Sequence, residues 1–172
     1  MITLAFYKGR GETVWQRLQD WGIRFATRSP YSHVELIPGR AEFDQPNTCL
    51  SSSGRDGGVR ETTITLRRDH WDLVDMEEQP EDIADFIRAR AGARYDYLGI
   101  VFSQILSLGR HDSAKWFCSE ICAAALGMPN AQRMSPQALY DVVIWSATQM
   151  PPDPEPLPID PPAPKRPGQP AA

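Results

Sequence analysis

The chain has 172 residues, enough for one domain with a sizeable core. Apolar residues make up 41% and charged residues 23%, as in an ordinary globular protein, and the formal net charge of −4 excludes a protein that binds nucleic acid mainly through a basic face. No apolar run approaches the ~18 residues of a transmembrane helix. Basic residues follow the short apolar N-terminus instead of preceding it, so no signal peptide is expected.

The first part of the chain is dominated by strand-like patterns. Residues 2–7 form an apolar run that predicts a first strand, and residues 13–27 carry a moderate helical stripe. Alternation of side chains and glycine-rich turns then predict further strands over residues 33–37, 48–53, 59–66 and 71–76.

The later part of the chain is mostly helical. Helices are predicted over residues 81–91, over part of 95–108, over 114–126 with Asp112 or Ser113 as the cap, and from Pro136. Strands that precede helices in this way indicate an α+β fold.

The C-terminal composition differs from the rest of the chain. The last 22 residues hold ten prolines and almost no large apolar side chains. Such a segment buries too little surface to offset the entropy of ordering. We therefore expect one folded domain over residues 1–148 and an extended or disordered tail over 149–172, which is either a tether to a protein partner or an artefact of gene layout.

The three cysteines, Cys49, Cys118 and Cys122, fit no closed disulfide framework because their number is odd. No C-x-x-C pair occurs, and the chain has three histidines, so no structural zinc site is predicted. The pattern suits a reducing compartment or a thiol that is kept free.

Cys118 is the best candidate for a reactive thiol. It follows a polar loop and lies near the start of a predicted helix, where the helix dipole lowers the pKa of a thiol. Cys122 lies one turn further along, against a run of alanines, and is better explained as a core residue. Ser119 and the backbone amides at the helix start are candidate donors to an oxyanion.

His33 is the candidate general base, because it lies inside an apolar strand while the other histidines lie in polar stretches. Strand alternation places Glu35 on the same face as His33, so Glu35 is one candidate to orient the imidazole. The neighbouring strand offers an alternative in Ser51, Ser52 or Ser53. A serine would orient a histidine more weakly than a carboxylate does.

Three short motifs, in this order, resemble the circularly permuted branch of the NlpC-type, papain-like superfamily. They are Ser32-His33-Val34-Glu35, Tyr95-Asp96-Tyr97-Leu98-Gly99 and Phe117-Cys118-Ser119-Glu120. That branch includes YiiX-like bacterial proteins and the lecithin:retinol acyltransferase group, and in it the histidine precedes the cysteine. The resemblance implies a permuted papain-like fold in which an antiparallel sheet packs against the helix of the nucleophile. It matches Cys118 to the nucleophile and His33 to the base. The branch often has glutamate or histidine on the next strand, where this chain has only serine.

The resemblance implies a cysteine hydrolase that cleaves an amide or ester through an acyl-enzyme, with cell-wall peptide as one candidate substrate and no cofactor or metal. The alternatives are a non-catalytic binding or structural module, for example a virion component of a phage, and a lipid-directed acyltransferase. We expect a cytoplasmic or virion-associated protein.

Overall fold

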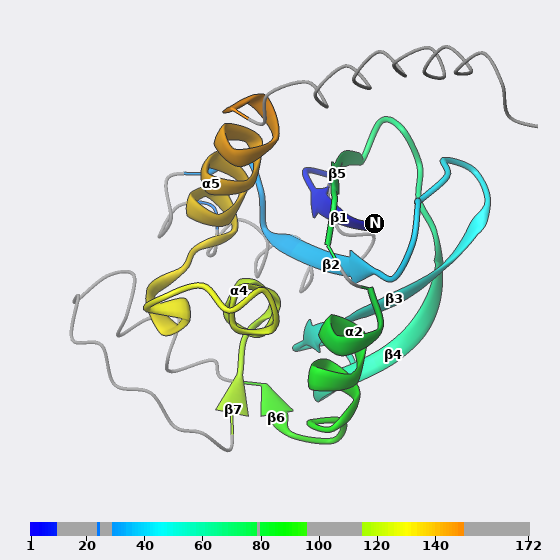
Figure 1. Cartoon of the computed structure of the whole chain (residues 1–172). Coiled ribbons are helices and arrows are strands. Elements are labelled where there is room, and N and C mark those ends of the chain that lie inside the picture. The colour runs from blue at the N-terminus through cyan, green and yellow to red at the C-terminus, as the bar shows by residue number, and fades with distance from the viewer. Residues whose placement is uncertain (10–23, 25–28, 79, 96–114, 150–172) are drawn as a thin grey trace, which may run out of the picture.

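A computed structural model describes residues 1–9, 24, 29–78, 80–95 and 115–149. Within these residues the protein is an α+β structure with one sheet and three α-helices (Figure 1). The expected α+β class is thus confirmed. The strands are β1 (Ile2–Tyr7), β2 (His33–Ile37), β3 (Pro46–Ser53), β4 (Gly58–Thr65), β5 (Trp71–Met76), β6 (Arg94–Tyr95) and β7 (Lys115–Trp116). The helices are α2 (Pro80–Arg88), α4 (Cys118–Ala125), the 3-10 turn η1 (Ala131–Arg133) and α5 (Pro136–Gln149).

The sheet has the strand order β5-β1-β2-β3-β4-β6-β7. Its five longer strands are antiparallel, and β1 lies between β2 and β5. The two-residue strands β6 and β7 extend the β4 edge and pair with each other in parallel. This edge matters for the site because the chain passes from β7 through Phe117 directly into α4.

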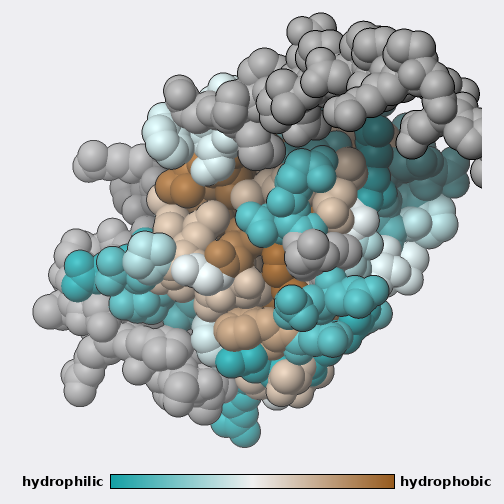
Figure 2. All heavy atoms as spheres, in the orientation of Figure 1, coloured by the Kyte–Doolittle hydropathy of each residue, from teal (hydrophilic) through white to brown (hydrophobic). Residues whose placement is uncertain are grey.

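The two faces of the sheet bury two separate apolar clusters. In β2, Val34 and Leu36 face a larger cluster that includes apolar side chains of α2, α4 and α5, so the helices cover this face. Ile37 belongs to a smaller cluster on the opposite face, together with Ala5 and Cys49. Figure 2 shows hydrophobic residues gathered in the middle of the viewed face, over the region in which Figure 1 draws α4 and α5.

The β3–β4 hairpin is the longest strand pair, and its register is continuous from Pro46 opposite Thr65 to Ser53 opposite Gly58. The tight connection uses Gly57 and Gly58 at φ +85° and +154°, values that side chains disfavour. The hairpin therefore fixes the position of every later β4 residue relative to β3.

The structure changes one predicted boundary near the candidate thiol. A continuous helix was expected over residues 114–126, but Lys115–Trp116 is a strand and the helix begins at Cys118. Pairing of β7 with β6 supplies hydrogen bonds that a helix would otherwise make within itself. Cys118 is consequently the first helical residue, with the extended Phe117 (φ −105°, ψ 167°) before it.

Several predictions lie outside the described residues. They are the helix over 13–27 except Arg24, the segment 96–108, the caps Asp112 and Ser113, and the proline-rich tail from 150 onwards. Tyr95, the last described residue before the segment 96–108, belongs to β6 and pairs with Trp116 of β7.

Candidate functional site: a cysteine, a histidine and a buried carboxylate

Cys118 is the first residue of α4 and therefore lies at the positive end of the helix dipole. The Phe117 amide donates to the carboxylate of Glu120 at 3.4 Å, so the first turn of the helix carries its own acidic residue. The Cys118 residue is 1% exposed, and its thiol forms no disulfide. The helix start thus fixes the thiol in a buried position.

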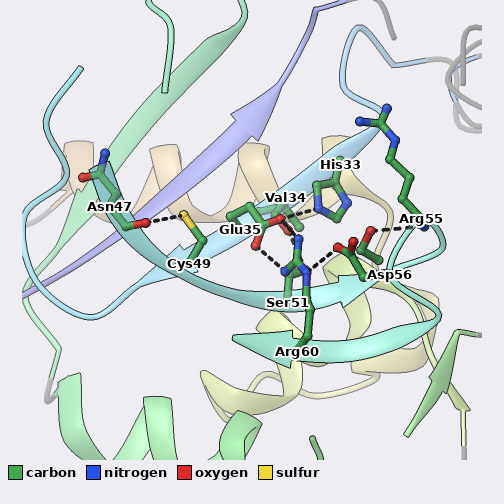
Figure 3. Close-up of polar contacts among 10 residues, drawn as sticks. His33, Val34, Glu35, Asn47, Cys49, Ser51, Arg55, Asp56 and Arg60 are labelled. Atoms are coloured by element: carbon green, nitrogen blue, oxygen red, sulfur yellow. Dashed lines mark hydrogen bonds and ion pairs between the residues drawn. The ribbon is translucent and has the colours of Figure 1, made fainter. Parts of the chain in front are cut away.

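His33 opens β2, and its side chain is 20% exposed. Its Nε2 lies 2.6 Å from Oε1 of Glu35, two residues further along the strand (Figure 3). Strand alternation explains this contact, because residues i and i+2 project to the same side. The predicted shared face of His33 and Glu35 is therefore confirmed, and so is their proximity.

Glu35 is fully buried, and Arg60 of β4 binds both of its carboxylate oxygens. The Arg60 Nη1 to Glu35 Oε2 distance is 2.7 Å, and Nη2 donates to Oε1. On its outer side Arg60 Nε donates to Asp56 Oδ2 at 2.8 Å. Figure 3 shows the resulting chain of contacts from His33 through Glu35 and Arg60 to Asp56.

Cys118 completes the group, because its side chain lies close enough to the imidazole of His33 to contribute to the raised pKa of that ring. The three residues come from two elements that are far apart in the sequence: β2 supplies His33 and Glu35, and α4 supplies Cys118. The structure thus brings Cys118 and His33 together with Glu35, which is one of the orienters that the sequence left open.

The pKa of His33 reflects two opposing effects. Burial disfavours the imidazolium, but the charges of Glu35 and Cys118 and the hydrogen bonds to both outweigh it and raise the pKa of His33 to about 9. Burial also favours the neutral form of Glu35. The charge of His33 and the hydrogen bonds from Arg60 and His33 outweigh that effect and hold the pKa of Glu35 below its usual value. At neutral pH the site therefore holds an imidazolium beside a carboxylate.

The other two cysteines have a different electrostatic setting. Burial is the main cause that raises the pKa of Cys49 to about 12 and the pKa of Cys122 well above its usual value. Both thiols stay protonated at neutral pH, which agrees with the interpretation of Cys122 as a core residue. Cys49 donates to the Asn47 carbonyl at 3.5 Å and does not share the position of Cys118 at a helix start.

The serines on β3 contact the backbone instead of the imidazole. Ser51 donates to the Val34 carbonyl at 2.7 Å, and Ser52 donates to the Trp116 carbonyl at 2.6 Å. The Ser53 hydroxyl accepts from the Arg55 amide at 3.2 Å. The sequence left Glu35 and these three serines as alternative residues to orient the imidazole. Glu35 contacts the ring, whereas the three serine hydroxyls have these other partners.

Ser119 was expected to supply an oxyanion donor, but its hydroxyl donates to the Met134 carbonyl at 2.6 Å and the residue is fully buried. This bond ties α4 to the residue that follows η1. The backbone amide of Cys118 at the helix start remains as the oxyanion candidate of that segment.

Arg60 is the member of the site that sequence analysis missed. The signal was present in the hairpin: a turn that pairs Ser53 with Gly58 also pairs Ser51 with Arg60, which places an arginine one strand beyond Ser51. The contact of Arg60 with Glu35 also requires that β2 pairs with β3, which the register of the hairpin alone does not reveal.

No protein-family model matches this chain, and no curated protein matches it. Among the described residues, no helix combines the length and apolar character needed to cross a membrane. Within the same residues, no group of three or more His, Cys, Asp or Glu side chains is arranged to hold a metal ion.

Proposed function

We propose that this protein is a cysteine hydrolase or acyl-transfer enzyme of permuted papain-like fold, with an amide or ester as its substrate. The observation that supports the proposal is the contact of Cys118, the first residue of a helix, with a histidine whose other partner is a buried carboxylate. Thiolate nucleophiles in acyl transfer need a base within hydrogen-bonding reach and a third group that orients the base.

The chemistry follows from the two nitrogens of His33. Nε2 is engaged by Glu35, so Nδ1 is the nitrogen that can exchange a proton with the Cys118 thiol. The thiolate attacks the carbonyl carbon, and the oxyanion accepts from amides at the start of α4. The imidazolium then protonates the leaving amine or alcohol, and a thioester to Cys118 remains. A water molecule deprotonated by His33 attacks the thioester carbonyl, the C–S bond breaks to release the carboxylic acid, and His33 returns the proton to the Cys118 sulfur.

Substrate identity is part of the proposal only as a chemical class. A carbonyl with an amine or alcohol leaving group fits the chemistry of the site, and a cell-wall peptide is one member of that class. Neither a metal nor an organic cofactor enters these steps.

Labelling of the thiols tests the proposal. Iodoacetamide near neutral pH, followed by peptide mass spectrometry, should modify Cys118 faster than Cys122, and the difference should disappear in His33→Gln. An activated ester such as p-nitrophenyl acetate should place one acetyl group on Cys118 in the wild-type chain. The matched control is Cys122→Ala, which should acylate like the wild type. Equally slow labelling of Cys118 and Cys122 would contradict the proposal of an activated thiolate at Cys118.

One observation favours a second candidate, a non-catalytic module with the same fold. Cys118 is 1% exposed, whereas the His33 side chain is 20% exposed, so the base is more open to solvent than the proposed nucleophile. A binding or structural module needs no access to the thiol. Absence of both acylation and alkylation at Cys118 in the folded chain would favour this candidate.

A further inference from the structure

We propose that Arg60 is a positioning residue of this site, which orients the Glu35 carboxylate toward His33 and compensates the negative charge of that carboxylate when the imidazole is neutral. The inference rests on the proposed function, because it assigns a role to Arg60 within the same site. Asp56 in turn holds Arg60 from the surface side.

The geometry of the Arg60–Glu35 pair supports orientation. A guanidinium that binds both oxygens of a carboxylate fixes the plane of that carboxylate, which a single contact cannot do. Glu35 Oε1 contacts both Arg60 Nη2 and His33 Nε2. The carboxylate plane that Arg60 fixes therefore also determines where Oε1 lies relative to the imidazole ring. The Arg60 side chain is 16% exposed and Glu35 is not exposed at all, so the pair lies mostly out of water.

The charges around Glu35 support compensation. Its carboxylate is influenced by His33 on its own strand and by Arg60 on β4. It also influences the thiols of Cys49 on β3 and Cys122 on α4. When His33 loses its proton, Arg60 is the cation of this group that still faces Glu35. A buried carboxylate without such a partner is strongly disfavoured.

The link from Arg60 to the surface passes through the β3–β4 turn. Asp56 is 47% exposed, and its amide donates to the Ser53 carbonyl at 3.2 Å. Arg60 therefore binds a second carboxylate, that of Asp56, on its solvent side. Asp56 competes with Glu35 for the positive charge of the guanidinium. This arrangement couples the conformation of the turn to the electrostatics of the histidine.

Arg60→Gln tests the proposal when the titration of the His33 ring is followed by NMR in the full chain without substrate. Loss of the proton would then leave Glu35 uncompensated, so the apparent pKa of the His33–Glu35 pair should rise by about one unit or more. Arg60→Lys keeps the charge and should return the value toward that of the wild type. The control is Arg88→Gln. Arg88 on α2 forms an exposed pair with Glu61, which lies beside Arg60 on β4, so this variant should leave the pKa of His33 unchanged.

A purely structural role for Arg60 predicts lower stability without a change in the titration of His33. An unchanged or lowered pKa in folded Arg60→Gln therefore overturns the proposal. If that variant does not fold, Asp56→Asn serves instead: without the competing carboxylate, Arg60 should act more strongly on Glu35 and the pKa of His33 should fall by less than one unit, whereas an unchanged value overturns the proposal. Cys118 labelling is measured separately, so a shifted histidine beside an unreactive thiol would reject the proposed function and retain the role of Arg60.

Discussion

The hydroxyl of Ser52 donates to the carbonyl of Trp116 at 2.6 Å, across 64 positions of the sequence. Both residues are buried. The bond joins the middle of the sheet to the last residue of β7, and Phe117 and Cys118 follow directly. The position of the thiol is therefore set by a sheet residue as well as by the helix that carries it.

Ser52→Ala should lower the free energy of unfolding by about 1–2 kcal/mol, because it leaves the Trp116 carbonyl without this buried donor. Alkylation of Cys118 should slow in the same variant, since β7 loses one of its constraints. Urea unfolding and iodoacetamide kinetics measure the two effects. Ser53→Ala is the control: the Ser53 hydroxyl only accepts from the Arg55 amide at 3.2 Å, so its removal should cost less. Equal losses in both variants would contradict the role assigned to Ser52.

Glu35→Gln should lower the pKa of His33 from about 9 toward or below its ordinary value of 6.5. The amide retains the size of the side chain but removes the charge, so burial becomes the dominant effect on the imidazole. Arg60 also loses its bidentate partner, and the expected loss of stability is about 3 kcal/mol. NMR titration of the ring and chemical denaturation measure the two quantities.

The control for that variant is Glu61→Gln. Glu61 pairs with Arg88 at 2.6 Å, but both side chains are more than 40% exposed, so the change should cost less than about 1 kcal/mol. It should also leave the titration of His33 unaltered. A Glu35→Gln protein in which His33 still titrates near 9 would show that the carboxylate does not set the protonation of the ring.

The folded protein should lose stability as the pH rises from neutral toward alkaline values. A pKa of His33 raised from 6.5 to about 9 contributes stability that is complete below pH 6.5 and is lost as the pH passes through 9. The expected contribution is about 3 kcal/mol, at about 1.4 kcal/mol for each unit of the pKa difference. Denaturation at a series of pH values measures the slope, and His33→Gln should lack it between pH 6.5 and 8. The thiols of Cys49 and Cys122, whose pKa values burial raises, destabilise the fold only above the pKa of an unfolded cysteine, so they do not contribute to the slope below pH 8.

How far the sequence alone predicts this site depends on the range of each interaction. Strand alternation is a local rule, and it correctly placed Glu35 beside His33. The choice of Cys118 over Cys122 used only the position along one helix, and the raised pKa of Cys122 agrees with it. Arg60 was missed because its contact with Glu35 depends on the order of β2, β3 and β4 in the sheet, which no local pattern reveals.

The errors near α4 have a similar physical cause. Lys115 and Trp116 have no strong preference that excludes a helix, and their strand conformation comes from pairing with Arg94 and Tyr95, about 20 residues earlier. The hydroxyls of Ser51, Ser52 and Ser119 look like free polar groups in the sequence, yet each donates to a backbone carbonyl of another segment. Tertiary partners of this kind decide which polar groups are available for chemistry.

Ser119→Ala should reduce stability without reducing the reactivity of the thiol. The hydroxyl bonds the Met134 carbonyl, so its loss should cost about 1–2 kcal/mol. The acylation rate of Cys118, measured with the activated ester under conditions in which the variant is folded, should stay within about twofold of the wild type, a difference below 0.5 kcal/mol. A large loss of rate with unchanged stability would restore Ser119 as an oxyanion donor.

Gly58→Ala should be among the most damaging small substitutions in the hairpin that carries Arg60. Its φ of +154° disfavours any side chain, and a Cβ there would overlap the carbonyl oxygen of Ala93, a backbone atom that cannot rotate away. Gly57→Ala is the matched control, because its φ is +85° but nothing lies within 4 Å of the added Cβ.

Backbone strain alone should cost Gly57→Ala about 1 kcal/mol, and strain with overlap should cost Gly58→Ala about 3 kcal/mol or more. Urea denaturation measures both. Because Gly58 pairs with Ser53 and with Arg94, the Gly58 variant should also displace the hairpin that fixes Arg60, and the NMR titration of His33 should move with it. Similar stabilities for the two variants would show that the close approach of Ala93 to Gly58 does not constrain the hairpin.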